Sequence, residues 1–377
     1  MNNKTKIQVE GWRGISHSYA LVNQFQLLAW LKDPNVELGH VDKPYFFNTW
    51  GKDKNPSGLN NHDKILIDSL SSLNDFDYTY RIYSPFNLKP DHKKRTAIFM
   101  VTEFGLDLTS INYLDLFELK QEGGIIITPS NWSKNRLLAN GIPAEILNVV
   151  PHSVDTSYFY KLSKEIINEQ RTSLGYKNDE VILLNVGTQH WAKGLDILIR
   201  AFAIARESRK DLRLILKDQR NTYALNTEEF IHNTLADNGL LTEDVINSIS
   251  LITADLNLNQ LNSLYNSADV YVSSYRAEGY NLPVHEAQAC GTKLIVTKNG
   301  ATDDFIDTKN SILLEGIQRT NVNLKSEIPI NSYIEPDIEH LVQSLMDCTR
   351  KDFLEYPVAH RPSWNDVAKN IKDLILK

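Results

Sequence analysis

Hydrophobic and polar residues alternate along the chain in two recurring patterns. Short runs of aliphatic residues, such as Val181–Val186 and Val270–Ser273, predict buried strands. Between such runs, apolar residues recur at helical spacing, as in Ser18–Leu31 with Leu21, Phe25, Leu28 and Leu31. Strands that alternate with helices of about ten or more residues predict βαβ units and parallel sheets.

The alternation falls into two blocks. The strands predicted for the first block are Lys6–Glu10, Val36–Val41, Tyr78–Tyr83, Thr96–Val101, Gly124–Thr128 and Ile146–Val150. Those predicted for the second block are Val181–Val186, Leu212–Lys217, Ile249–Thr253, Val270–Ser273 and Lys293–Thr297. We therefore expect an α/β protein with two doubly wound, Rossmann-like domains, residues 1–160 and 161–355, that face a central cleft. The last segment, 356–377, predicts a helix over Trp364–Leu376 that packs back on the first domain.

Composition and charge narrow the class of protein. Of 377 residues, 42% are hydrophobic and 23% are charged, which is typical of globular domains and excludes disordered or collagen-like chains. The net charge of -7 argues against a nucleic-acid partner. The two cysteines, Cys290 and Cys348, are too few for a disulfide framework or a metal cluster.

The first residues, MNNKTKIQVEGW, contain no apolar leader, and no apolar run approaches the length that spans a bilayer. We expect a soluble, cytoplasmic protein. The basic segment Lys89–Arg95 leaves peripheral membrane contact as an alternative to an ordinary solvated loop.

The segment Ser273–Phe305 carries the most chemical information. Glu278 precedes a predicted helix whose first turn contains Pro283, and Glu286 follows Glu278 after seven residues, inside that helix. The free N–H groups near Asn281 can bind an anion, and the two carboxylates can accept hydrogen bonds from sugar hydroxyls. The alternative is an acid that stabilises the helix dipole beside an ordinary surface glutamate.

This segment resembles the signature of retaining glycosyltransferases of family four, which have the GT-B fold. The shared elements are the first Glu, a Gly-aromatic turn, Leu-Pro, the second Glu and Ala-x-Ala-Cys-Gly. Three further segments resemble the family in the same order along the chain: Thr128–Pro143, Val149–Asp155 and Asn185–Phe202. The resemblance covers residues 124–305 well and the first hundred residues loosely.

The resemblance implies roles for particular residues. It makes Glu278 the ligand of a donor sugar's hydroxyls, Glu286 the ligand of the ribose, and Lys193 the cation at the donor diphosphate. The turn between the glutamates would approach the donor with four residues, Gly279, Tyr280, Asn281 and Leu282. Without this pattern, Lys193 would be interpreted as a solvated lysine.

The chain also departs from the family. Thr188 stands where many members have an arginine, so Lys217 is the candidate second phosphate cation, with a solvated strand end as the equal alternative. In the first domain, Gly14 is the candidate glycine of close ligand approach. Ser18 or Ser16 is expected to cap the following helix. Glu103 replaces the family's histidine and can bind an acceptor hydroxyl, act as a base, or only cap a turn.

Aromatic residues gather in the first domain and leave two interpretations open. Tyr45, Phe46, Phe47 and Trp50 lie close together in the sequence, and Trp12 lies earlier in the same domain. They can stack against a glycan or belong to the hydrophobic core.

The function implied is a retaining glycosyltransferase that moves a sugar from a UDP- or GDP-sugar to a glycan, a lipid-linked or a protein acceptor. We expect no metal site, and no cofactor beyond the donor substrate. Two alternatives stay open: a sugar-nucleotide epimerase or hydrolase on the same frame, and a non-catalytic sugar-nucleotide-binding subunit of a transferase complex.

Overall fold

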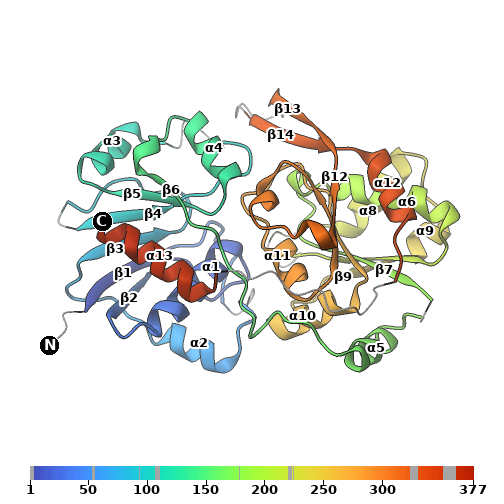
Figure 1. Cartoon of the computed structure of the whole chain (residues 1–377), viewed down its shortest axis with the longest axis horizontal. Coiled ribbons are helices and arrows are strands. Elements are labelled where there is room, and N and C mark those ends of the chain that lie inside the picture. The colour runs from blue at the N-terminus through green and yellow to red at the C-terminus, as the bar shows by residue number, and fades with distance from the viewer. Residues whose placement is uncertain are drawn as a thin grey trace. The chain divides into compact units, whose positions relative to one another are not determined.

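A computed structural model describes residues 4–52, 56–92, 94–106, 111–177, 179–219, 223, 225–322, 330–350 and 362–377. The chain divides into two compact units (Figure 1). The first is formed mainly by Met1–Asp155 and Arg361–Lys377, and the second by Thr156–Thr320 and Ser332–His360.

The first unit is built on a six-stranded parallel sheet in the order β2-β1-β3-β4-β5-β6. Its strands are β1 (Thr5–Gly11), β2 (Val36–Asp42), β3 (Tyr78–Ile82), β4 (Arg95–Phe99), β5 (Ile125–Thr128) and β6 (Leu147–Val149). Its helices are α1 (Ser18–Leu31), α2 (Asn61–Asp68), α3 (Tyr113–Gln121), α4 (Asn131–Ala139), the short η2 (Ala144–Ile146) and α13 (Trp364–Leu376). The strand order reverses between β1 and β3, so the loop after β1 lies at the switch point of this sheet.

The second unit contains a second six-stranded parallel sheet, in the order β12-β11-β10-β7-β8-β9. Its strands are β7 (Val181–Val186), β8 (Leu212–Lys217), β9 (Ile249–Ile252), β10 (Val270–Ser273), β11 (Lys293–Thr297) and β12 (Ser311–Leu314). The sequence order 3-2-1-4-5-6 of a Rossmann fold is recovered when β7 is counted as the first strand. The switch point of this sheet therefore lies between β7 and β10.

The second unit also contains helices, several of which connect the strands of its sheet. They are α5 (Lys164–Ser173), η3 (Trp191–Lys193), α6 (Leu195–Ser208), α8 (Thr227–Asp237), α9 (Glu243–Asn247), α10 (Leu258–Ser267), α11 (Leu282–Ala289), η4 (Ala301–Asp304), η5 (Thr308–Asn310) and α12 (Ile338–Met346). A separate two-stranded sheet pairs β13 (Gly316–Val322) with β14 (Ile330–Pro336). The predicted fold class of two parallel, Rossmann-like α/β domains is confirmed.

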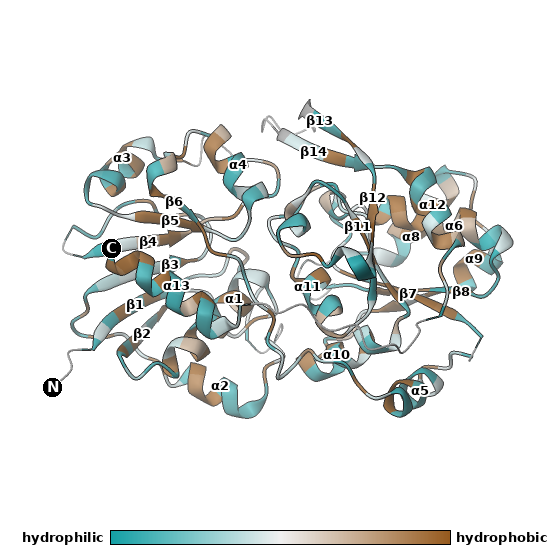
Figure 2. Ribbon diagram, in the orientation of Figure 1, coloured by the Kyte–Doolittle hydropathy of each residue, from teal (hydrophilic) through white to brown (hydrophobic). Residues whose placement is uncertain are grey.

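The strands of both sheets are mostly hydrophobic, whereas the helices have mixed surfaces (Figure 2). In the second unit, α6 supplies much of the core, with Leu198, Ile199 and Phe202 fully buried against the sheet. This is the burial expected of a parallel sheet covered by helices on its faces.

The C-terminal helix α13 packs on the first unit, beside α1 (Figure 1). The indole N–H of buried Trp30 donates to the carbonyl of Ala368 at 2.9 Å. Trp364 stacks on Phe25 with ring centroids 5.4 Å apart, and Lys372 forms an ion pair with Asp33. The C-terminal helix is thus held to the first unit along most of its length, by packing, a hydrogen bond and an ion pair.

Two local predictions are wrong. His17, rather than Ser18 or Ser16, caps α1, because its Nδ1 accepts the N–H of Tyr19 at 3.2 Å. The apolar periodicity after Val181–Val186 predicts a helix over Lys193–Glu207, but the helix begins at Leu195, because Gly194 adopts a left-handed conformation with φ of 64° that separates η3 from α6.

If α13 is an integral part of the first unit, Ile371→Ala should lower the free energy of unfolding by about 2–5 kcal/mol, because Ile371 is fully buried. The control is Leu376→Ala on the same helix, where the side chain is exposed and the change should stay within about 0.5 kcal/mol. Urea unfolding followed by circular dichroism measures both. Equal stability of the two variants would contradict the packing.

Candidate functional site

Two loops at the switch point of the second sheet bring opposite charges together. The loop after β7 carries Lys193, and the loop after β10 carries Glu278. Nζ of Lys193 lies 2.8 Å from Oε1 of Glu278, and both side chains are largely withdrawn from solvent. Ligands of open α/β sheets bind beyond the carboxyl ends of the strands at such a point. Two residues predicted from separate motifs therefore meet where a ligand is expected.

The backbones of these loops are in direct contact. Oγ of Ser274 donates to the carbonyl of Gly194 at 2.9 Å, and the N–H of Arg276 donates to the carbonyl of Ala192 at 2.7 Å. A Cβ on Gly194 would lie 1.8 Å from the carbonyl oxygen of Ser274, so no other residue fits. The glycine thus allows the approach that places Lys193 beside Glu278.

The turn between Glu278 and α11 is almost entirely buried. Asn281 has a φ of 79°, and its side chain donates to Oγ of Ser273 at 3.1 Å instead of capping α11. Tyr280 is buried, stacks on Phe305 with centroids 4.7 Å apart, and its hydroxyl lies 3.1 Å from Nδ1 of His285. Gly279 precedes Tyr280 in this turn, and Leu282 opens α11.

Glu286 lies inside α11 and has a neutral partner. The hydroxyl of Tyr265 on α10 donates to Oε2 of Glu286 at 2.7 Å. Burial raises the pKa of Glu286 to about 7, and the hydrogen bond from Tyr265 only partly offsets this effect. Burial and the nearby carboxylate raise the pKa of Tyr265 well above its usual value, so the phenol keeps its proton. With a pKa of about 7, the carboxyl group of Glu286 is partly protonated and partly ionised at neutral pH.

Lys217, at the end of β8, is buried, so the solvated alternative for this residue is wrong. Its ammonium group donates to the carbonyl of Asp218, and burial lowers its pKa. The carboxylate of Asp218 is also buried and accepts the hydroxyl of Thr227 at 2.7 Å. Because β7 and β8 pair Val186 with Lys217, this cation lies at the same sheet edge as the loop that carries Lys193.

The other two predicted residues belong to the first unit. Gly14, in the loop after β1, has a φ of 84°, and its N–H donates to Oε1 of Gln24 at 2.9 Å. Glycine is favoured here by the backbone conformation, and a Cβ would also approach the side chain of Lys52 to 2.7 Å. Glu103 is partly buried in the loop after β4, and its carbonyl accepts the indole N–H of Trp132 at 2.8 Å.

Some of the aromatic residues of the first unit belong to its hydrophobic core, and others are exposed, as stacking against a glycan would require. Trp12 and Trp50 are buried and pack edge to face at 5.8 Å. Phe46 and Phe47 are 57% and 45% exposed, and Phe47 packs against Trp50 at 5.2 Å. Tyr45 donates to the carbonyl of Arg13 at 2.8 Å. The tryptophans thus form a core that presents two exposed phenylalanine rings.

The basic segment Lys89–Arg95 is partly neutralised by contacts within the first unit. Lys94 lies 3.4 Å from a carboxylate oxygen of Asp75, His92 pairs with Glu122, and Arg95 donates to two carbonyls. Lys93 lies outside the described residues. Within the described ranges, no helix is both long and apolar enough to cross a membrane.

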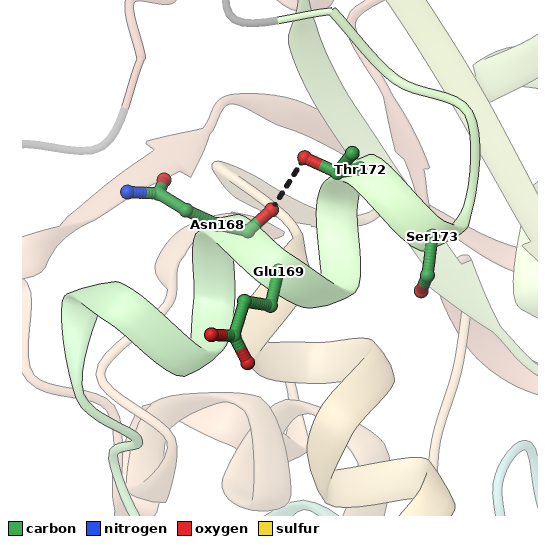
Figure 3. A pocket seen from close by; sticks show the side chains of 4 residues that line it. All are labelled: Asn168, Glu169, Thr172 and Ser173. Atoms are coloured by element: carbon green, nitrogen blue, oxygen red, sulfur yellow. Dashed lines mark hydrogen bonds between the residues drawn. The ribbon is translucent and has the colours of Figure 1, made fainter.

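A depression on the surface of α5 is separate from these residues. Figure 3 shows its four side chains, all from one helix: Asn168, Glu169, Thr172 and Ser173. Thr172 donates to the carbonyl of Asn168 at 2.9 Å, which is a contact within the helix. The lining of this depression contains none of the predicted site residues. Among the residues described by the structure, no three His, Cys, Asp or Glu side chains cluster as metal ligands do.

Two residues at the site were missed by sequence reasoning. Arg276 lies two positions before Glu278 and donates to Trp191 in the loop after β7 and to Asp196 in α6, and Tyr265 donates a hydrogen bond to Glu286. A second charged residue close to Glu278 in the segment SSYRAEG was the available signal for Arg276. Tyr265 has no such signal, because its contact depends on how α10 packs against α11.

Comparison with known proteins finds that this chain is similar to glycosyltransferases. Residues 166–316 match the profile of the family described as "Glycosyl transferases group 1". The chain is 29% identical over 180 residues to D-inositol 3-phosphate glycosyltransferase of Paenarthrobacter aurescens, which covers 47% of this chain and 41% of that protein. The chain thus spans less than half the length of this curated relative.

Solved structures share the fold over nearly the whole chain. A glycosyltransferase from Rickettsia africae superposes with a TM-score of 0.61 at 15% identity, covering 100% of this chain and 94% of that one. HepE of Anabaena, in complex with UDP and glucose, gives a TM-score of 0.58 at 14% identity, with coverages of 98% and 94%. The chain shares with these structures the two-domain GT-B fold.

The raised pKa of Glu286 predicts how stability depends on pH. From about pH 4.5 to 7 the folded chain holds a proton that the unfolded chain releases, so the free energy of unfolding falls as pH rises. Glu286→Gln should remove this part of the slope, which amounts to up to about 3 kcal/mol across the interval.

Urea unfolding at several pH values between about 4 and 8 measures the slope. Glu169→Gln, at an exposed position on α5, is the matched control and should keep the wild-type slope. If Glu286→Gln and the wild type keep parallel pH profiles, Glu286 is not protonated in the folded protein.

Proposed function

We propose that the chain is a retaining glycosyltransferase that takes its sugar from a UDP- or GDP-sugar bound to the second unit. The observation that carries this proposal is the Lys193–Glu278 ion pair at the switch point, next to the N-terminus of α11. The match of residues 166–316 to a glycosyltransferase family supports it, and so does the fold shared with HepE.

In this proposal the donor separates the ion pair. The diphosphate binds Lys193 and the N–H groups at the start of α11, where the helix dipole favours negative charge. Glu278, released from Lys193, accepts hydrogen bonds from hydroxyls of the transferred sugar. Glu286 accepts hydrogen bonds from the ribose, and the residues of the turn, Gly279 to Leu282, line the donor.

The reaction breaks the bond between the anomeric carbon and the diphosphate oxygen. A hydroxyl oxygen of the acceptor attacks the same face of the sugar, so the new bond keeps the configuration. The proton of that hydroxyl passes to the departing phosphate oxygen. The negative charge that develops on the diphosphate is stabilised by Lys193, with Lys217 as the second cation. In this scheme side-chain cations supply that charge, and no metal ion is required.

We propose that the acceptor binds the first unit. Glu103 and the loop of Gly14 lie at the carboxyl ends of its strands, where α/β sheets bind ligands. The exposed rings of Phe46 and Phe47 offer a surface on which sugar rings stack. A glycan, a lipid-linked sugar or a glycosylated protein would satisfy this chemistry.

A thermal-shift panel of UDP- and GDP-sugars, followed by transfer assays, tests the function. A donor bound only by the folded chain at one hundred times its Kd stabilises it by about 2.7 kcal/mol. Transfer with retained configuration supports the proposal, whereas inverted product contradicts the mechanism. Donor binding without transfer to any acceptor favours a non-catalytic subunit. Free sugar as the sole product indicates a hydrolase, and an altered donor sugar indicates an epimerase.

Lys193→Gln should lower kcat by about 100-fold and change the KM for the donor much less, because the cation acts on charge that develops in the transition state. Lys210→Gln is the matched control, since it also removes the cation of an ion pair in the second unit. The control should transfer at the wild-type rate. A wild-type rate from the Lys193 variant would disprove the role of this lysine.

A further inference from the structure

A buried arginine joins the two loops that carry the ion pair. The side chain of Arg276 is 6% exposed and lies between Asp196 of α6 and Glu335 of β14. Its guanidinium makes two hydrogen bonds of 2.7 Å to the carboxylate of Asp196 and two of 2.8 and 3.0 Å to that of Glu335. A fifth bond, of 3.0 Å, goes to the carbonyl of Trp191. Five bonds match the five N–H donors of a guanidinium group.

Arg276 is connected to both members of the ion pair through the chain segments that carry them. Trp191 and Asp196 lie on either side of Lys193 in the sequence, so the guanidinium holds the ends of the short segment that carries this lysine. Arg276 itself lies two residues before Glu278. Any displacement of the guanidinium would therefore change the relative positions of Lys193 and Glu278.

Packing and charge restrain this guanidinium further. The guanidinium lies over the ring of Trp191, 4.7 Å from the ring centroid. The backbone carbonyl of Arg276 accepts the N–H of Ile334 on β14 at 2.9 Å. Burial disfavours its charge, but the two carboxylates outweigh burial and raise its pKa above the usual value. A lysine could not reproduce the two bidentate pairs, because it lacks the planar fork of an arginine.

We propose that Arg276 is a positioning residue that sets the spacing of Lys193 and Glu278. The hydrogen bonds of its side chain go to Trp191, Asp196 and Glu335, so it acts through the Trp191–Asp196 segment and through β14. The expected effect on kcat rests on the proposed function. The expected effect on the spacing of Lys193 and Glu278 does not depend on that function.

Crystal structures of Arg276→Lys and of a control test the structural consequence. The control is Arg206→Lys, because Arg206 is equally buried in the same unit, lies in the last turn of α6, at the end of this helix away from Lys193, and pairs with Asp244 at 3.1 Å. We expect the Lys193–Glu278 pair to separate beyond about 4 Å in the first variant and to persist in the control. If the pair persists in Arg276→Lys, the inference is wrong whatever the chain catalyses.

Kinetics separate positioning from general loss of stability. Arg276→Lys should lower kcat by about tenfold or more, and Arg206→Lys should change it by less than about twofold even where the two melting temperatures fall equally. In a Lys193→Gln background, Arg276→Lys should have little further effect on kcat, because both changes disable the same contact.

Two kinetic results would overturn the inference. One is a wild-type kcat in Arg276→Lys. The other is a double variant whose loss of kcat equals the product of the losses in Lys193→Gln and in Arg276→Lys. If the wild-type chain transfers no sugar at all, the proposed function fails, and the crystal structures still decide the role of Arg276.

Discussion

The contact between the backbones of Gly194 and Ser274 is the constraint on which the second unit's site depends. Parallel strands deliver their loops to one edge of the sheet, but ordinary side chains would keep two such loops apart. A glycine with a left-handed backbone removes that obstacle, and the carbonyl of Ser274 occupies the space where a Cβ would stand. Lys193 precedes this glycine directly, so the same contact that joins the loops brings the ammonium group to Glu278.

The two glutamates of the site lie in different environments although only a short turn and the start of α11 separate them in the sequence. Glu278 has a cation as its partner, whereas Glu286 has the neutral hydroxyl of Tyr265. Burial raises the pKa of Glu286 to about 7, because the hydrogen bond from Tyr265 only partly compensates for the lost hydration. The spacing of Glu278 and Glu286 in the sequence therefore does not predict that their environments differ, because the environment of Glu286 arises from the packing of α10 on α11.

Local patterns predict much of the fold and part of the site. Helix Ser18–Leu31 and strands Val181–Val186 and Val270–Ser273 have the predicted bounds, because their apolar periodicity coincides with their burial. By contrast, β13 and β14 were not predicted, since a two-stranded sheet buries too little to impose a clear pattern. The roles of Arg276 and Tyr265 come from contacts between residues distant in sequence, for which spacing along the chain gives no information.

Charge balance links the buried groups to the proposed donor. A diphosphate brings two negative charges to an edge where Lys193 is already matched by Glu278, so one lysine cannot compensate for all of them. Protonation of Glu286 removes one negative charge from the same region, and the start of α11 adds a partial positive charge. Lys217 lies at the same edge, at the end of β8, and its ammonium group donates to the carbonyl of Asp218. Burial lowers the pKa of Lys217, and the carboxylates of Asp218 and Asp255 partly offset this effect. In the proposed complex, a phosphate near this lysine would stabilise its charged form further.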